Sequence, residues 1–254
     1  FTILRTEPKF ENATFTSLNN VLYIASEGNP LMKYDGSRVY KAGMKKGTTP
    51  TLYNTSGSGG SLSNGEYLYR ITYEYQDAKN NLIQGTISDH LQVTLGSGGS
   101  TQSVILNLTS VLDNEGYNTS DATKLKIKIW RTNKVSAISP GDEFTLTYYL
   151  AGEVNNGTAT FTDTTNESVP TSTTFYNFPS NDPDVPPTDC KYITTYQGML
   201  ILSGSKSNPD SVYYSDSLTP EGFPETENNF NVVSGKGQGI TGLKPLTDTL
   251  FIFH

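Results

Sequence analysis

A cluster of carboxylates in the last third of the chain is the feature that comes closest to catalytic chemistry. Asp216 is followed by Glu221, Glu225 and Glu227 in the segment SDSLTPEGFPETEN. Glycoside hydrolysis needs two carboxyl groups at a suitable separation, one acting as acid and the other as base or nucleophile. The pattern therefore leaves a glycosidase open as a hypothesis, although acidic loops are more often simply solvated.

The remaining candidates for catalysis or ligand binding are weaker. His90 and His254 lie far apart in the sequence and outside any metal-binding motif. Asp182 and Asp184 lie in a proline-rich segment, which is typical of solvated surface. The run Gly235–Gly239 resembles a phosphate-binding loop in its glycines, but such a loop needs its lysine followed by Ser or Thr at the start of a helix, and here a glycine follows. We therefore expect no catalytic, cofactor-binding or metal-binding residue, and a protein that is not an enzyme.

The composition of the 254 residues limits the possible functions. The net charge of −7 at pH 7 argues against a general nucleic-acid-binding surface, because phosphates are neutralised by clustered Lys and Arg. The most basic stretch, Lys124–Arg131, alternates lysines with Leu125, Ile127 and Ile129, which predicts a strand with one solvated face and one buried face. Cys190 is the only cysteine, so an internal disulfide is impossible.

Apolar runs and chain ends bear on cellular location. No run approaches the roughly 18 apolar residues of a membrane-spanning helix, and the start lacks the pattern of a signal peptide. We therefore expect no membrane span. The chain starts at Phe1 and stops at His254 directly after an apolar strand pattern, which we interpret as a piece of a longer polypeptide.

The elements that must position these residues are short antiparallel strands. The stretch Ile193–Asp216 predicts a strand, a turn at Gln197–Gly198 and a second strand at Met199–Ser203. A loop closed by Asn208–Asp210 then leads to a third strand at Ser211–Ser215. No window of a dozen residues keeps apolar side chains at helical spacing without Gly, Pro or a β-branched run, so we expect an all-β chain.

A ten-residue pattern of strand, polar turn and strand occurs three times. It reads FTSLNNVLYI at Phe15–Ile24, ITTYQGMLIL at Ile193–Leu202 and LKPLTDTLFI at Leu243–Ile252. A meander with two free edges cannot bury its apolar face alone, so a repeated one implies stacking or radial packing of copies. The last two copies begin 50 residues apart, which falls within the roughly 40–50-residue spacing of propeller blades.

The first copy extends into a complete blade. We expect this blade at Phe10–Met44, where the dipeptide Asp35–Gly36 predicts a tight hairpin turn. Tyr23, Leu31 and Tyr34 are the candidates for the core between blades.

The large gap between the first two copies predicts an inserted domain. They begin 178 residues apart, so 178 − 50 = 128 residues remain beyond one blade. Segments rich in Gly, Ser, Thr or Pro flank this surplus, and we expect Lys45–Ser61 to be a flexible, unpacked linker and Asn166–Pro187 to be extended. The expected organisation is a partial β-propeller (1–47), an insert with its linkers (48–174) and further blades (175–254).

The insert has the strand pattern of an immunoglobulin-like or fibronectin-III-like β-sandwich, with about seven strands in roughly 100 residues. The strands are expected at Gly65–Gln76, Leu82–Asp89, His90–Leu95, Ser103–Leu108, Leu125–Thr132, Phe144–Val154 and Thr158–Asp163. In the first of them, Tyr67, Tyr69, Tyr73 and Tyr75 share a face, which we interpret as core, with sugar stacking as the alternative. Trp130 falls on the lysine face of its strand by strict alternation, so we expect it at a sheet edge or re-aimed by a bulge.

Two parts of the sequence resemble a known family. The run YYSDSLTPEGFPETENNFNVVSGKGQGITGLKPLTDTLFIF (Tyr213–Phe253), together with VLYIASEGNPLMKYDG (Val21–Gly36), is similar to the propeller of tail proteins from tailed bacteriophages, particularly the nozzle or tubular-B-type and hub proteins of short-tailed phages. The stretches GEYLYRITYEYQ, KLKIKIWRT and FTLTYYLAGEV resemble the fibronectin-like modules that interrupt such propellers. The chain departs from the family pattern at Thr219–Glu221, where Asn-Pro-Glu is commoner.

This resemblance implies a structural virion protein of the phage tail and carries no catalytic residue across. Its copies would form a homo-oligomeric ring below the portal and adaptor, around the channel through which double-stranded DNA passes without sequence-specific contacts. The inserted sandwich would face outward, toward tail fibres or neighbouring tail proteins. An acidic lumen would suit this role because it would not hold back passing phosphates. The alternative is a cell-surface carbohydrate-binding protein with propeller and fibronectin modules.

Overall fold

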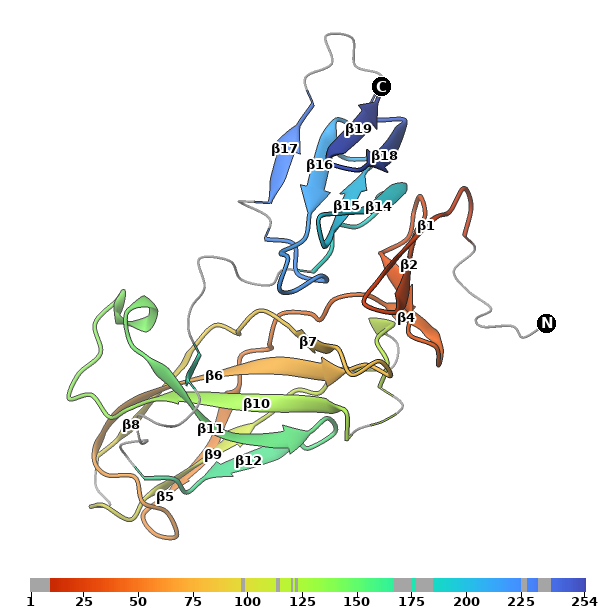
Figure 1. The fold of residues 1–254 in the computed structure, drawn as a ribbon. Coiled ribbons are helices and arrows are strands. Elements are labelled where there is room, and N and C mark those ends of the chain that lie inside the picture. The colour runs from red at the N-terminus through yellow and green to blue at the C-terminus, as the bar shows by residue number, and fades with distance from the viewer. Residues whose placement is uncertain are drawn as a thin grey trace.

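The computed structural model describes residues 10–96, 99–112, 115–119, 121, 123–166, 175–176, 185–224, 228–232 and 239–254. This part of the chain is all-β, as expected, and forms several open antiparallel sheets (Figure 1). It has no α-helix, and a 3₁₀ turn spans Asp142–Phe144. Accordingly, the described residues contain no helix that could cross a membrane.

Two four-stranded meanders and a two-stranded hairpin carry the repeated sequence. The first meander pairs four strands in chain order: β1 (Thr14–Leu18), β2 (Val21–Ala25), β3 (Met32–Tyr34) and β4 (Val39–Lys41). The second meander does the same with β14 (Tyr192–Tyr196), β15 (Met199–Ser203), β16 (Ser211–Tyr214) and β17 (Asn229–Asn231). The C-terminal hairpin consists of β18 (Gly242–Leu246) and β19 (Thr249–Phe253). The strands predicted within Ile193–Asp216 are therefore confirmed.

All three copies of the ten-residue pattern have the same register. The first and last residues of each copy lie opposite each other, as the pairs Phe15–Ile24, Ile193–Leu202 and Leu243–Ile252. The first turn residue also has the same left-handed backbone in each copy, with φ of 51° at Asn19, 49° at Gln197 and 47° at Thr247. A two-residue turn of this hand matches the twist of the strands that it joins.

The repeated sheets stack in series through the same two faces. We define the front face of each sheet by the positions equivalent to Phe15, Leu22 and Ile24, and the back face by those equivalent to Tyr23 and Ala25. The back face of the first meander packs on the front face of the second, through Val21, Tyr23 and Ala25 on one side and Ile193, Leu200 and Leu202 on the other. The back face of the second meander then packs on the front face of the hairpin, through Tyr192, Tyr196, Met199 and Ile201 against Leu243, Leu250 and Ile252.

Hydrogen bonds at the first strand of each sheet reinforce this stacking. Thr14 Oγ1 accepts a bond from the backbone N–H of Ile193 at 3.0 Å and donates one to the carbonyl of Lys191 at 2.8 Å. One sheet further along, Tyr196 OH donates to the carbonyl of Asp248 at 2.6 Å. β1, β14 and β18 thus follow one another along a common side of the stack.

The three residues predicted to form the core between blades divide between two faces. Tyr23 and Leu31 are buried between the first and second meanders, as predicted. Tyr34 instead packs beside Ile24 and Met32 on the front side. The reason is its register: Tyr34 lies opposite Leu22, which belongs to the front face.

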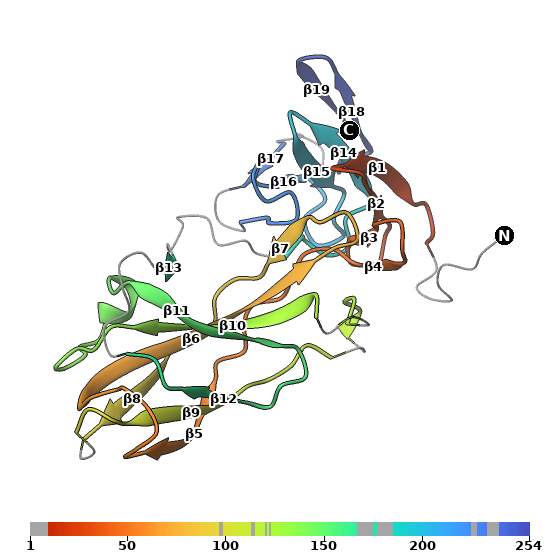
Figure 2. The same ribbon diagram turned by 60° about the horizontal axis from the view of Figure 1, so that its bottom comes forward.

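Between the two meanders in sequence lies a pair of sheets that share one apolar core, which we call the sandwich. The larger sheet has the order β13 (Phe175–Tyr176), β11 (Tyr148–Asn155), β10 (Leu125–Thr132), β6 (Gly65–Gln76) and β7 (Leu82–Gln84), with β8 (Leu91–Leu95) also paired with β6. The smaller sheet has the order β12 (Thr160–Asp163), β9 (Ser103–Asn107) and β5 (Thr51–Ser56). Both views place the sandwich on one side of the stacked sheets, with β7 toward them (Figures 1 and 2).

The core of the sandwich contains the face of β6 that carries the tyrosines. Tyr67, Tyr69 and Tyr73 have no exposed surface, and Tyr75 is 4% exposed. The core interpretation is therefore confirmed, and these rings are not available for sugar stacking. The alternating residues of β10 behave as predicted too, because Leu125, Ile127 and Ile129 are fully buried in the same core and the lysines between them are not.

The prediction of an unpacked linker at Lys45–Ser61 is wrong. Residues Thr51–Ser56 form β5, which pairs with β9. Before it, the backbone N–H of Gly47 donates to the carbonyl of Thr86 at 2.8 Å. A Cβ atom at Gly47 would lie 2.2 Å from the carbonyl oxygen of Ile71, so the glycine that suggested flexibility instead permits a close approach of two backbones.

Two other predicted strands are shorter than expected. The segment Leu82–Asp89 forms a strand only as far as Gln84, and Phe144–Val154 is a strand only from Tyr148 onward. Gly85 ends β7 where the chain meets another segment, since a Cβ atom there would lie 2.1 Å from the carbonyl oxygen of Lys45.

Trp130 lies in the interior of a sheet, so the expected position at a sheet edge is wrong. Its strand, β10, is paired on both sides, and the bulge between Ile129 and Trp130 belongs to the pairing with β11 and not to that with β6. The side chain stays on the lysine face and is covered there by Leu68, Tyr148 and Tyr176. Its indole N–H donates to Thr72 Oγ1 at 2.9 Å.

Candidate functional site

Four buried charged side chains meet where the sandwich touches the two meanders. Lys33 lies in the middle of β3, Asp35 follows that strand in the Asp–Gly turn, Asp77 follows β6, and Glu221 lies in the loop between β16 and β17. Their exposed fractions are 1%, 0%, 0% and 6%, respectively. We call these four residues the charged junction. Buried charges are costly unless they are paired and hydrogen-bonded, so the partners of each one decide what it does.

Glu221 is the centre of the charged junction. Its Oε1 accepts hydrogen bonds from Lys33 Nζ at 2.6 Å and from Tyr23 OH at 2.9 Å, and its Oε2 accepts one from the backbone N–H of Gly43 at 2.6 Å. Burial and the neighbouring Glu221 charge raise the pKa of Tyr23 well above its ordinary value, so the phenol keeps its proton as a donor. Donors from the first meander and the segment after it therefore hold a carboxylate of the second.

Lys33 connects this carboxylate with the sandwich. Its Nζ lies 3.8 Å from Asp77 Oδ2 and 5.0 Å from the centre of the Tyr40 ring, which adds a cation–π contact. Asp77 is held in place by its own turn, because its Oδ1 accepts the backbone N–H groups of Lys79 and Asn81 at 2.8 Å each. One lysine thus pairs with carboxylates from the second meander and from the sandwich.

Asp35 makes a second connection between the first meander and the sandwich. Its Oδ1 accepts the backbone N–H and the hydroxyl of Ser37, and its Oδ2 accepts Tyr40 OH at 2.9 Å and the backbone N–H of Ala78 at 3.0 Å. Burial alone would raise the pKa of Asp35, but the hydrogen bonds from Ser37, Ala78 and Tyr40 outweigh it and hold the pKa below its ordinary value. Asp35 therefore stays ionised as a fixed acceptor.

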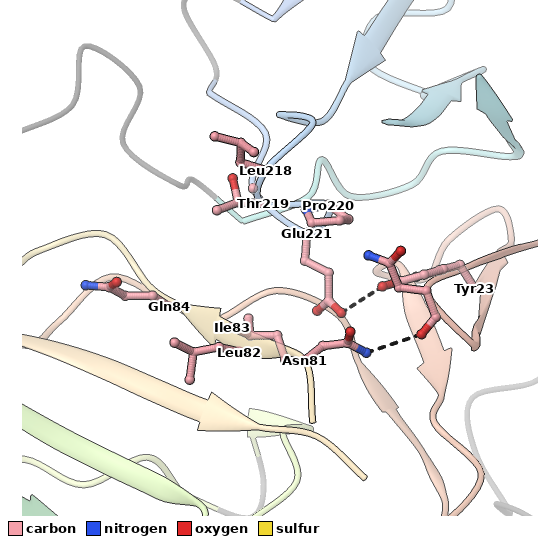
Figure 3. A pocket seen from close by; sticks show the side chains of 11 residues that line it. Tyr23, Asn81, Leu82, Ile83, Gln84, Leu218, Thr219, Pro220 and Glu221 are labelled. Atoms are coloured by element: carbon pink, nitrogen blue, oxygen red, sulfur yellow. Dashed lines mark hydrogen bonds between the residues drawn. The ribbon is translucent and has the colours of Figure 1, made fainter. Parts of the chain in front are cut away.

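A small cavity lies next to the charged junction. Its volume is about 240 Å³, and it is bounded by the turn after β1, by Tyr23, by β7 with the preceding Asn81, and by the loop Leu218–Gly222. Figure 3 shows Leu218 and Leu82 on opposite sides of this cavity, with Glu221 directed toward Tyr23. Apolar groups therefore flank the opening, whereas the polar groups at one end are bonded to each other.

The carboxylates suggested for glycoside hydrolysis are not assembled as a pair. Glu221 is directed at Lys33, Tyr23 and Gly43, and Asp216 Oδ1 accepts the backbone N–H of Leu218 at 2.7 Å, which closes the start of the loop. Glu225 and Glu227 lie outside the described residues. A glycosidase acid has to reach the glycosidic oxygen of its substrate, and Glu221 is instead buried in a network of protein donors.

The other residues considered for chemistry are dispersed or lie outside the described ranges. His90 and His254 join no group, since the described part of the chain holds no cluster of three or more His, Cys, Asp or Glu side chains suited to a metal ion. Asp182 and Asp184 are outside the described residues, as is most of the Gly235–Gly239 run. Gly239 itself has a φ of 66° and packs against Pro209, so the run ends in a backbone conformation that favours glycine.

Sequence reasoning missed the charged junction. Its members are dispersed along the chain, and no motif links Lys33, Asp77 and Glu221. One local signal was present: Lys33 stands between Met32 and Tyr34 in a short strand, where a lysine on a buried face needs a counter-charge. The identity of that counter-charge depends on tertiary contacts alone.

Comparison with known proteins yields no relative. No protein-family model matches the sequence. No curated protein matches it, and no solved structure resembles the fold closely enough to count as a match.

Proposed function

We propose that this chain is a structural component of a bacteriophage tail, of nozzle or hub type, in which the repeated sheets are successive blades of a β-propeller and residues 48–174 are an inserted immunoglobulin-like or fibronectin-III-like module. The observation that carries the proposal is the serial stacking. Two successive contacts use the same back face and the same front face, as expected for blades related by rotation about one axis.

Head-to-tail stacking of this kind leaves an apolar face at each end that no other sheet of the described chain covers, and exposed apolar side chains lie on both. On the front face of the first meander, Phe15 is 57% exposed and Leu22 is 36% exposed, whereas Ile24 is 6% exposed and packs with Phe10. On the back face of the hairpin, Leu246, Phe251 and Phe253 are 62%, 45% and 51% exposed. Contacts between unlike faces continue until the rotation closes a ring, so these two open faces support a wheel that is completed by further copies of the sheet.

The candidate site supports a structural role and not a catalytic one. Its carboxylates connect three parts of the fold, and Glu221 is held by Tyr23, Lys33 and the backbone of Gly43. The sandwich is tied to the meanders by Asp77 and Ala78 and would form an outward arm of the wheel, able to contact fibres or neighbouring subunits.

The charge of the chain also fits a channel for DNA. A net charge of −7 gives the protein little general attraction for phosphates, so DNA would pass without being retained. The proposed location is the virion tail, with homo-oligomeric copies and other tail proteins as neighbours.

Electron microscopy of the purified, assembled protein tests this function. The expected result is a ring of several copies around an open centre, with the sandwiches at the periphery. A glycan-array measurement on the same sample is the matched test of the alternative. A monomer that binds glycans would overturn the proposal in favour of a cell-surface carbohydrate-binding protein.

A further inference from the structure

We propose that the cavity between β7 and the loop Leu218–Gly222 binds an extended peptide segment of another protein chain, which adds a strand to β7 and places one aliphatic side chain in the cavity. This inference goes beyond the tail function and does not depend on it, because all of its parts lie within one copy of the chain.

The backbone of β7 has its outer edge directed at the cavity. β7 is the last strand of the larger sheet, and Glu74 lies opposite Gln84 and Gln76 opposite Leu82. Because the N–H of Gly85 donates to the carbonyl of Tyr73, the alternation of an antiparallel ladder turns the N–H and C=O groups of Leu82 and Gln84 away from β6. These are the groups to which an added strand would bond.

The same edge is already used two residues further along. The outward carbonyl of Thr86 accepts the backbone N–H of Gly47 at 2.8 Å. The segment that contains Gly47 then leaves the edge, and Gly43 bonds to Glu221 instead. An added strand beside Leu82 and Gln84 would therefore continue a pairing that the chain begins itself.

The lining of the cavity indicates what the added strand carries. The volume of about 240 Å³ lies below the roughly 300–1,000 Å³ of small-molecule pockets and suits one or two side chains. Leu218 is 90% exposed and Leu82 is 60% exposed, on opposite sides of the opening (Figure 3). Glu221, the charged residue of the lining, is already bonded to Tyr23 and Lys33. A charged group on the added strand would therefore find no partner in the cavity. An uncharged, aliphatic side chain is the match.

The loop opposite β7 is preorganised for such a contact. Asp216 Oδ1 accepts the N–H of Leu218, the N–H of Asp216 donates to the carbonyl of Gly222, and the N–H of Gly222 donates to the carbonyl of Thr219. Glu221 anchors the same loop to Lys33. Binding would therefore cost little ordering of the loop, and Leu218 is already exposed on it for an apolar contact.

Peptide titration followed by NMR tests this site on the intact chain. The probes are two acetylated and amidated heptapeptides, Thr-Ser-Thr-Leu-Thr-Ser-Thr and the same sequence with Asp at the centre. We expect the Leu peptide to shift the amide signals of Leu82, Gln84 and Gly222 and to bind at least about tenfold more tightly than the Asp peptide, because only the Leu peptide buries an aliphatic side chain.

Matched variants separate the apolar contact from the strand pairing. Leu218→Asp should weaken the Leu peptide about tenfold, whereas Phe144→Asp, at an exposed aromatic residue elsewhere on the sandwich, should leave affinity unchanged. Gln84→Pro removes an outward N–H and should weaken binding, while Gln84→Ala keeps that N–H and should not. Equal affinity of the two peptides, shifts confined to other residues, or a Leu218→Asp variant that binds normally would overturn the proposal.

Discussion

The two kinds of internal contact in this chain differ in how much buried charge they contain. Meander packs on meander through apolar faces, and the buried residues Leu200 and Leu202 represent that contact. At the charged junction, Lys33 pairs with Asp77 of the sandwich and with Glu221 of the second meander, and Tyr40 of the first meander packs edge-on against Tyr75 of the sandwich. The apolar contact occurs twice between equivalent faces, whereas the charged junction occurs once among the described residues.

An apolar contact can be repeated from sheet to sheet, whereas a contact between buried charges fixes the relative position of particular elements. An apolar face is non-directional, so any copy of the sheet can stack on any other. A buried charge requires a particular partner in a particular place, and a wrong partner leaves it desolvated and unpaired. The chain therefore uses apolar faces for the repeating stack and adds a charge network where the first meander, the second meander and the sandwich meet.

Removing the cation of the charged junction is expected to have the largest effect on the free energy of unfolding. Lys33→Met leaves the buried carboxylates of Glu221 and Asp77 without their positive partner, which should lower the free energy of unfolding by about 4 kcal/mol. Urea unfolding of the two proteins at neutral pH measures the difference.

A double variant shows whether the loss of stability in Lys33→Met comes from the Lys33–Glu221 ion pair. Lys33→Met combined with Glu221→Gln should be less destabilising than the sum of the single changes by about 1–3 kcal/mol, because both charges are then removed together. Simple additivity of the two costs would contradict direct coupling between Lys33 and Glu221.

The apolar contact is tested by one position of the repeat in two settings. Leu200 is fully buried in the front face of the second meander, and the equivalent Leu22 is 36% exposed on the open front face of the first. Leu200→Ala should cost about 3 kcal/mol of unfolding free energy, and Leu22→Ala less than about 1 kcal/mol, when monomeric chains are compared. Equal costs at the two positions would mean that the open face is already covered.

Acid should weaken the charged junction and leave the apolar contacts unchanged. The pKa of Asp35 lies below its ordinary value in the folded chain, so its stabilising contribution is complete above the unfolded-state pKa of about 3.9 and is lost as pH falls below that value. Asp35→Asn should lower stability by about 2 kcal/mol at pH 7. Denaturant midpoints at pH 7 and pH 3 should show this gap narrowing in acid, and a gap that stays constant would refute the assignment.

Substitutions in the turns of the repeat are expected to have the smallest effect on the free energy of unfolding. Thr247 has a φ of 47°, a left-handed backbone that a β-branched residue adopts with strain, whereas the equivalent position of the first copy is Asn19. Thr247→Asn should therefore raise the free energy of unfolding by about 0.5–1 kcal/mol. Gln197→Asn should raise it less, and thermal unfolding of both variants ranks them. A destabilising Thr247→Asn change would show that the third turn differs from the first.

The sequence allowed the repeat to be predicted because turn chemistry and strand alternation are local properties. The Asn–Asn and Gln–Gly turns and the alternating strands around them are readable within ten residues. β5 was missed because its strand state comes from pairing with β9, which lies far away in the sequence. The role of Gly47 was misjudged for a related reason, since a glycine at a close backbone contact looks the same in sequence as a glycine in a linker.

The candidate site was less accessible to prediction. Glu221 was recognised as a residue of interest, but in a glycosidase hypothesis, because its partners Lys33 and Tyr23 come from another sheet. Long-range pairing of this kind leaves no spacing rule in one sequence. Trp130 illustrates the same limit: alternation placed it on the correct face, but the segment that covers that face could not be identified.

A cryo-electron microscopy map of the assembled protein tests the central claim most directly. The serial stacking predicts that the open front face with Phe15 and Leu22 is covered by the back face of another copy of the sheet, and that Phe251 on the open back face is covered by a front face. Solvent around both faces, or separation of the first meander from the second, would contradict the account.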